Sequence, residues 1–195
     1  MKKNFYECNA DVMTYIIVDF EATCCDRGTV PRNEMEIIEI GAVALDGEGP
    51  AVAGEFSEFI RPVRNPRLTR FCTELTGITQ EMLEGASGFK KVLFEFKKWI
   101  WSFEKPVFCS WGEYDRVQLE RDCAYHSVPY PFDYQHINIK KKFAYNNELR
   151  KACGLGQAIR MAGLEFNGRH HRGIDDAKNM ARLSEFIFGS EICAD

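Results

Sequence analysis

The chain has 195 residues, of which 45% are hydrophobic and 28% are charged, and its formal net charge is -4. This apolar fraction is too high for a disordered protein and is sufficient for one domain with a buried core. No apolar run approaches the roughly 18 residues of a membrane span, and residues 1–10 lack the apolar block of a signal peptide. The slightly acidic balance argues against a protein that coats long stretches of duplex nucleic acid. We therefore expect a cytoplasmic protein without membrane association, with one domain over residues 1–195 and a core at about 15–188.

The eight cysteines include one adjacent pair, Cys24 and Cys25, and no two of the eight are spaced as Cys-x-x-Cys. A zinc ribbon and a thioredoxin-type motif are therefore not supported. Because no secretory signal is present, we expect reduced thiols that act as small core residues. A nucleophilic cysteine beside one of the four histidines is the less favoured interpretation.

Three apolar segments near the start of the chain predict strands, at residues 15–18, 37–45 and 52–60. The first is apolar throughout and rich in β-branched residues, as expected for a strand covered on both faces. Turn signals end the other two segments, at Asp46-Gly47 and Arg61-Pro62. Since no helical pattern separates the three segments, they predict an antiparallel meander.

The later part of the chain has helical periodicity. Apolar residues at helical spacing over 89–103 predict an amphipathic helix, for which Ser87 is the expected N-terminal cap. The elements expected after it are a strand at 107–110 and helices at 114–126, 157–162 and 174–188. This order predicts a mixed α/β sheet with helices on both faces.

Two carboxylates follow the first predicted strand. Asp19 and Glu21 are two residues apart, so that in a strand they lie on the same face, while Phe20 points to the other face. Carboxylates held close together in a partly buried position repel one another, and a hard divalent cation removes that conflict. By itself the pair is a weak signal, because Asp-x-Glu is common by chance.

Two later segments contain the other candidate residues. Asp115 falls in the first turn of the helix at 114–126, where an acid is also favoured by capping and by the helix dipole. His171 and Asp176 span a loop-to-helix boundary, which suits a mobile histidine base and a rigidly held acid. Capping acids and surface histidines are the structural alternative. Acids from several segments that converge on one spot instead indicate a pair of divalent cations for phosphodiester hydrolysis.

At these residues the chain resembles the DEDD superfamily of 3′-to-5′ exonucleases, in the group with a histidine base (DEDDh). The segments similar to its three motifs are residues 18–24, 114–119 and 171–179. Residues 59–66 and 71–80 are similar to the Eri-type branch, which trims RNA 3′ ends, and to its bacterial sporulation-inhibitor-like relatives. The resemblance covers about residues 15–188. It implies a ribonuclease-H-like α/β fold, with three antiparallel strands followed by parallel strands, flanked by helices.

The resemblance also implies roles for the acids and the histidine. The residues expected to bind two Mg²⁺ or Mn²⁺ ions are Asp19, Glu21, Asp115 and Asp176, and Glu21 is also counted as catalytic. The family pattern places the catalytic histidine four residues before the last acid, which selects His171 over His170 as the general base. The implied product of each turnover is a nucleoside 5′-monophosphate.

The expected substrate is the 3′ end of a single-stranded nucleic acid. The resemblance gives its binding residues as Ala22, Thr23, Phe71, Leu75, Ile78, Tyr114 and Arg172. The first two are expected at the terminal hydroxyl, the two aromatic residues against bases, and the two aliphatic residues along the slot. Arg172, like Arg169, is a candidate for a phosphate contact. Core packing is the alternative for the aromatic and aliphatic residues.

RNA is favoured over DNA as the substrate, but the motifs serve both polymers, so a DNA-directed proofreading or repair exonuclease is the first alternative. A catalytically inactive nucleic-acid-binding protein is the alternative from another class. A separate protein partner is a possible source of targeting.

Overall fold

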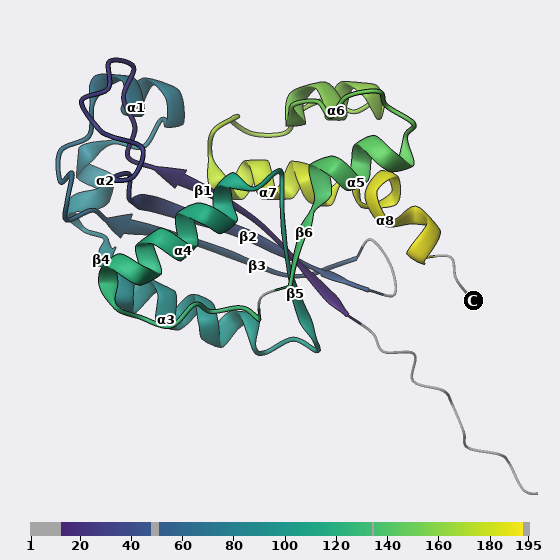
Figure 1. Ribbon diagram of the computed structural model, residues 1–195, viewed down its shortest axis with the longest axis horizontal. Coiled ribbons are helices and arrows are strands. Elements are labelled where there is room, and N and C mark those ends of the chain that lie inside the picture. Colours follow the sequence, from purple (N-terminus) through teal and green to yellow (C-terminus); the bar gives the residue numbers. More distant parts are fainter. Residues whose placement is uncertain (1–12, 48–50, 134, 193–195) are drawn as a thin grey trace, which may run out of the picture.

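The computed structural model describes residues 13–47, 51–133 and 135–192, which form one six-stranded sheet between two layers of helices (Figure 1). Its strands are β1 (Thr14–Ala22), β2 (Ile37–Asp46), β3 (Val52–Arg61), β4 (Ser87–Gly88), β5 (Pro106–Ser110) and β6 (His136–Asn138). The spatial order is β4-β3-β2-β1-β5-β6. The first three strands are antiparallel, whereas β5 and β6 continue the sheet in parallel with β1. The predicted fold class is confirmed.

Eight helices in the described part of the chain cover this sheet. They are α1 (Arg70–Thr76), α2 (Gln80–Glu84), α3 (Phe89–Ile100), α4 (Tyr114–His126), α5 (Ile139–Asn146), α6 (Leu155–Met161), α7 (Gly173–Ala181) and α8 (Ser184–Ile192). One apolar cluster joins the sheet to α3 and α4, and another joins its opposite face to α5, α6, α7 and α8. In Figure 1, α1 and α2 lie near the end of the sheet where β1 terminates.

The alternation of side chains along β1 assigns its residues to the two faces. Val18 and Phe20 belong to the core beneath α3 and α4, whereas Ile17 belongs to the core beneath α7. By the same period of two, Asp19 and Glu21 fall on the α7 face. The predicted separation of Phe20 from the two acids is therefore confirmed.

Two glycines allow α7 to lie directly on the sheet. A Cβ atom at Gly41 of β2 would overlap the backbone of Gly173, and a Cβ at Gly173 would lie 2.8 Å from the carbonyl oxygen of Asp19. No larger residue fits this contact without moving the helix, since interiors are packed to van der Waals distance. The first turn of α7 is thereby held over the end of β1.

The structure corrects two expectations about helices. The single helix predicted at 174–188 is two helices, because the chain turns at residues 182–183 and buries Leu183 in the core. The residues expected to face inward there are nevertheless all buried: Ala177, Met180, Ala181, Ser184 and Ile187. Ser87 lies in β4 and does not cap α3, whose N-cap is Gly88 without a side-chain bond. The short elements α1, α2, α5, β4 and β6 were not expected.

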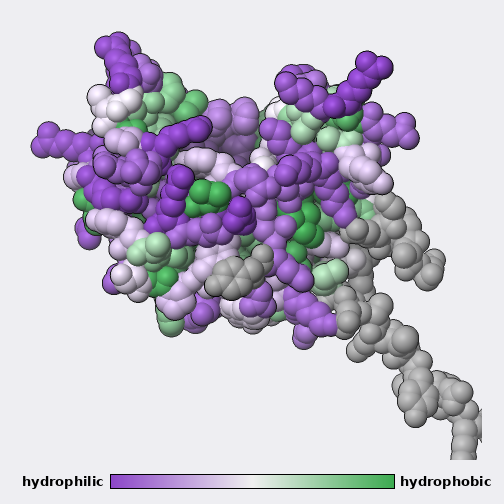
Figure 2. Space-filling view, in the orientation of Figure 1, coloured by the Kyte–Doolittle hydropathy of each residue, from purple (hydrophilic) through white to green (hydrophobic). Residues whose placement is uncertain are grey.

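No helix in the described ranges has the length and apolar character needed to cross a bilayer. The face of the molecule shown in Figure 2 is mainly hydrophilic, and its hydrophobic areas are small and separate. No disulfide joins the six cysteines of the described ranges, in agreement with the expected reduced thiols. The other two, Cys8 and Cys193, lie outside the described residues.

Candidate active site

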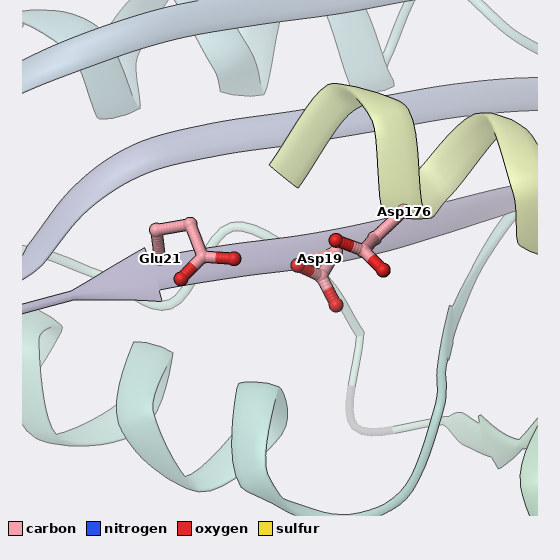
Figure 3. A group of neighbouring side chains, drawn as sticks. All are labelled: Asp19, Glu21 and Asp176. Carbon is pink, nitrogen blue, oxygen red and sulfur yellow. The ribbon is translucent and has the colours of Figure 1, made fainter. Parts of the chain in front are cut away.

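Three carboxylates from two elements converge beside the end of β1. Asp19 and Glu21 project from β1, and Asp176 projects from the first turn of α7 toward them (Figure 3). Each offers an oxygen, and the three oxygens lie within 4.8 Å of one another. Three of the four acids predicted from the sequence are thus brought together.

Backbone groups of the preceding loop hold the Asp176 carboxylate in place. Its Oδ2 accepts hydrogen bonds from the backbone N–H of His171 at 2.7 Å and of Arg172 at 3.1 Å. Its Oδ1 lies 2.7 Å from Nδ1 of His170. An acid near a helix N-terminus commonly satisfies such free N–H groups. The fixed position of Asp176 therefore follows from the local sequence.

The fourth acid, Asp115, lines the same cleft but is not part of the group of three. It is buried in the first turn of α4, and its Oδ1 accepts the backbone N–H of Phe20 at 3.1 Å. The ladder between β1 and β5 ends at Ile17 and Cys109, so Phe20 needs another acceptor. This bond directs one oxygen of Asp115 toward the backbone of β1, while its charge still raises the pKa of Asp19, and its role as a fourth metal ligand stays a prediction.

The acids are held in an environment that disfavours their charge. Burial raises the pKa of Glu21 to about 9, and the charges of Asp176 and Glu39 add to this rise. Burial, followed by the charges of Asp115 and Glu21, also raises the pKa of Asp19. Burial raises the pKa of Asp115 to about 6. A charge-compensating group at this position would relieve the conflict.

The donor set fits a divalent cation. Hard cations prefer carboxylate oxygens, and clustered acids without a matching positive charge are costly to ionise. The guanidinium of Arg172 pairs with Glu39, since its Nε donates to that carboxylate at 3.1 Å and its NH2 group at 3.3 Å.

Two adjacent histidines line the cleft beside these acids. The rings of His170 and His171 stack with centroids 4.3 Å apart. His171 has a left-handed backbone, with φ of 65°, which turns the chain between the loop and α7. Partial burial, and then the charge of His170, lower the pKa of His171 below its usual value. A neutral imidazole at pH 7 is the form required of a base.

Three of the predicted substrate residues line the cleft, which encloses about 450 Å³: Ala22, Leu75 and Tyr114. The Tyr114 side chain is 42% exposed, and its hydroxyl contacts the sulfur of Met35 at 3.8 Å. Leu75 comes from α1. The cleft therefore lies between β1, α1, α4 and the loop at residues 162–172, which carries His170 and His171 and is called the histidine loop below. An exposed aromatic ring at such a position is available for stacking on a base.

The structure places the other four predicted substrate residues outside the cleft. Thr23 is buried, and its hydroxyl accepts the N–H of Glu36 at 3.0 Å. Ile78 is fully buried in a small core cluster under α1 and α2, so it packs and does not meet a ligand in this structure. Phe71 lines a separate depression beside the cleft. The guanidinium of Arg172 pairs with Glu39, and its predicted contact with a phosphate stays a prediction.

Sequence analysis missed several residues that shape the site. The cleft is also lined by Phe20, Cys24, Arg32, Met35, Trp111, Gly154, Leu155 and His170. Glu39, the cross-strand partner of Glu21, is fully buried and accepts the N–H of Gly173 at 3.1 Å. A glutamate inside the apolar strand β2 was the available signal for this residue. The cleft residues carry no such signal because they come from segments that are far apart in the sequence.

The raised carboxyl pKa values predict that the metal-free protein loses stability as pH rises. Below its ordinary pKa of 4.5, Glu21 is protonated in both the folded and the unfolded protein. Between that pH and about pH 9 it ionises in the unfolded protein but not in the folded one, so the free energy of unfolding falls as pH rises. In EDTA we therefore expect Tm to fall by roughly 5 °C or more between pH 5 and pH 9. That fall corresponds to a loss of about 2 kcal/mol in the free energy of unfolding. Thermal unfolding monitored by circular dichroism measures it.

Glu21→Gln tests the cause of this pH dependence. We expect the variant to be more stable than the unmodified protein at pH 8 in EDTA, since it removes the disfavoured charge. The matched control is Glu58→Gln, an exposed glutamate of β3. An equal change in the slope of Tm against pH for both variants would contradict the prediction.

Comparison with known proteins gives the family. The pattern of the RNase_T exonuclease family matches residues 16–184. ERI1 exoribonuclease 3 of Homo sapiens is 35% identical over 182 residues, which cover 89% of this chain and 53% of that protein. The 3'-5' exonuclease Snipper of Drosophila melanogaster is 30% identical over 191 residues, which cover 87% of this chain and 68% of that protein. This chain thus spans about half the length of the ERI1 exoribonuclease 3 proteins.

Comparison with solved structures supports the same family. The nuclease domain of 3'hExo, a DEDDh family member bound to rAMP, has a TM-score of 0.83 and 31% identity, and the match covers 95% of each chain. The Escherichia coli exonuclease I complex with an oligonucleotide, at 11% identity and a TM-score of 0.69, shares the fold alone. The fold and the acid cluster together match the ribonuclease-H-like fold of metal-dependent nucleases. The chain belongs to the RNase_T exonuclease family, and the predicted resemblance to its DEDDh group is confirmed.

Proposed function

We propose that this chain is a 3′-to-5′ exoribonuclease that removes nucleoside 5′-monophosphates from single-stranded RNA with two Mg²⁺ or Mn²⁺ ions. The observation that carries the proposal is the group of three carboxylate oxygens within 4.8 Å, in a cleft that also contains both histidines. Family membership adds the reaction class. The cytoplasmic location expected from the sequence stays a prediction.

The residues proposed to hold the cations are Asp19, Glu21 and Asp176, with Asp115 as the fourth acid of the cleft. When bound, the cations supply positive charge that offsets the phosphodiester and lowers the pKa of water. The role proposed for His171 is to accept the proton of the attacking water, since its lowered pKa keeps the imidazole neutral. The Asp176 carboxylate, held by two loop N–H groups, keeps that loop beside the acids.

The cleft is proposed to receive the terminal nucleoside. Leu75 and Tyr114 supply apolar and aromatic surface along its walls, and the backbone at Ala22 lies directly beyond the acids. Stacking and apolar contact accept any base, which suits an enzyme that must degrade a mixed sequence. Base identity is therefore not expected to change the rate strongly.

RNA is proposed over DNA because relatives at 35% identity are named exoribonucleases and a structural relative holds rAMP. Discrimination would require a contact to the ribose 2′ hydroxyl, which DNA lacks. A DNA-directed 3′ exonuclease is the alternative, and it is favoured only if DNA is degraded at least as fast. A targeting protein partner stays a prediction.

The test is degradation of matched RNA and DNA oligonucleotides, labelled at the 5′ end, with Mg²⁺, Mn²⁺ or EDTA. We expect a ladder that shortens from the 3′ end of the RNA, release of 5′-monophosphates, and no reaction in EDTA. Activity in EDTA would exclude the metal-dependent mechanism. Cleavage within the oligonucleotide, or release from the 5′ end, would exclude the proposed polarity.

Tyr114→Ala tests the stacking wall of the cleft. We expect KM for short RNA to rise by about 5- to 100-fold with little change in kcat, because stacking of one base contributes about 1–3 kcal/mol. Tyr114→Phe keeps the ring and should behave as the unmodified protein. Tyr145→Ala is a matched control on α5, where the side chain is 85% exposed. An unchanged KM for Tyr114→Ala would remove this residue from the binding site.

A further inference from the structure

Arg169 joins the histidine loop to helix α1. Its guanidinium NH2 group donates to the carbonyl oxygen of Glu74 at 3.0 Å, across 95 positions of sequence. Its backbone N–H donates to Oδ2 of Asp175 at 2.9 Å. One residue therefore contacts both α1 and the first turn of α7.

The end of α1 is shaped to receive this guanidinium. Gly77 caps the helix in the left-handed conformation, with φ of 72°, and its N–H bonds to Thr73. A Cβ atom at Gly77 would overlap the guanidinium of Arg169, so the absence of a side chain leaves the space it occupies. The carbonyl of Glu74 lacks its usual helical donor, because the N–H of Ile78 is bonded to the Thr76 hydroxyl. A cation at this carbonyl also complements the helix dipole.

The bridge connects two walls of the cleft. Leu75, adjacent to the accepting carbonyl, lines the cleft from α1, while His170 and His171 line it from the loop. The loop is also held by Asp175 and Asp176, by the pair of Arg172 with Glu39 of β2 and by bonds between Asn167 and Asn179, none of which reaches α1. Arg169 is therefore the side chain that links the histidine wall to the α1 wall by a hydrogen bond.

We propose that Arg169 is a positioning residue, which ties the loop carrying His171 to the C-terminal end of α1 and sets the separation of the two cleft walls. Its catalytic consequence rests on the proposed function. When the tie is removed, the histidine loop gains freedom while the acids on β1 stay in place. Rate then falls because the base is misplaced, whereas loss of a phosphate contact would instead weaken substrate binding.

The first test measures amide hydrogen exchange in the protein alone, without substrate or metal. In Arg169→Ala we expect faster exchange of the N–H groups of His171 and Arg172, both bonded to Asp176, by about 10-fold or more, since local opening becomes easier. Exchange in β1 and β2 should be unchanged. Loop exchange equal to that of the unmodified protein would overturn the proposal, whatever the activity.

The second test is steady-state RNA degradation. We expect kcat of Arg169→Ala to fall by about 10- to 100-fold, with KM within about 3-fold, as for a small displacement of a reacting group. Arg169→Lys, which retains a donor for the Glu74 carbonyl, should recover part of that loss. A rise in KM at constant kcat would overturn the positioning role in favour of substrate contact.

Arg70→Ala is the matched control. Arg70 lies on α1, and its guanidinium pairs with the side chain of Glu74 on the same helix. The substitution therefore removes one positive charge, as Arg169→Ala does, without removing a contact of the histidine loop. Its kcat and loop exchange should match the unmodified protein, and an equal defect there would reduce the Arg169 effect to charge alone. If the unmodified protein degrades no RNA, the proposed function fails, while the exchange measurement still decides the role of Arg169.

Discussion

Asp19→Asn is expected to reduce metal-dependent RNA degradation by about 10³-fold or more, because preorganised charge is usually the largest contribution to such catalysis. Asp19 lies between Glu21 and Asp176 in the group of oxygens within 4.8 Å, so its loss removes a ligand from the centre of the set. Asparagine has nearly the same volume and leaves β1 intact. Single-turnover degradation of labelled RNA over a range of Mg²⁺ and Mn²⁺ concentrations measures the effect.

The same substitution should not unfold the protein. Burial and neighbouring acids raise the pKa of Asp19, so a neutral side chain relieves repulsion in the metal-free state. We expect Tm in EDTA to be equal to or above that of the unmodified protein. Asp133→Asn, an exposed aspartate far from the acids in sequence, is the control and should keep full activity. Full activity of Asp19→Asn would eliminate the proposed mechanism.

His171→Ala is expected to lower kcat by about 10²- to 10⁴-fold, the usual contribution of a general base, with little change in RNA affinity. The imidazole lines the cleft beside the acids. Because the pKa of His171 lies below its ordinary value of 6.5, kcat should rise with pH as the imidazole loses its proton, with a midpoint below pH 6.5. Pre-steady-state rates from pH 5 to pH 8 separate chemistry from product release.

His170→Ala is the matched control for this assignment. Its ring bonds Oδ1 of Asp176, so its loss should loosen a carboxylate and reduce activity less than His171→Ala does. Of these two variants, the one that lacks the general base is expected to lose the pH dependence of kcat below pH 7. If His170→Ala shows that loss and His171→Ala does not, the base is His170.

Most of the fold could be predicted from local patterns in the sequence. Alternation in β1 placed two acids opposite Phe20, and the helix over 114–126 is observed as α4 with the same bounds. Such patterns are readable because the period of the side chains is a property of the local backbone. The break at residues 182–183 was not readable, since the apolar spacing continues through it and only the core decides where Leu183 goes.

The partners of charged residues were the least predictable part of the site. Arg172 follows His171 in sequence, yet its guanidinium is bound by Glu39 of β2, 133 positions away. Arg169, three positions earlier, donates to a backbone carbonyl of α1. The sequence distinguishes neither case, because an arginine in a loop has the same local signature whether it meets a ligand or a carboxylate of the protein.

By itself, the sequence predicted that Asp19 and Glu21 share one face of β1, because strand alternation is a local property of the chain. It also determined that the first three strands are antiparallel neighbours, since short connections without helices imply that arrangement. Only the tertiary structure decided that three of the acids lie within 4.8 Å of one another while Asp115 bonds the backbone of β1, that Ile78 is buried, and that Arg172 pairs with Glu39. Those outcomes depend on side chains from distant segments that compete for the same hydrogen bonds and the same buried space.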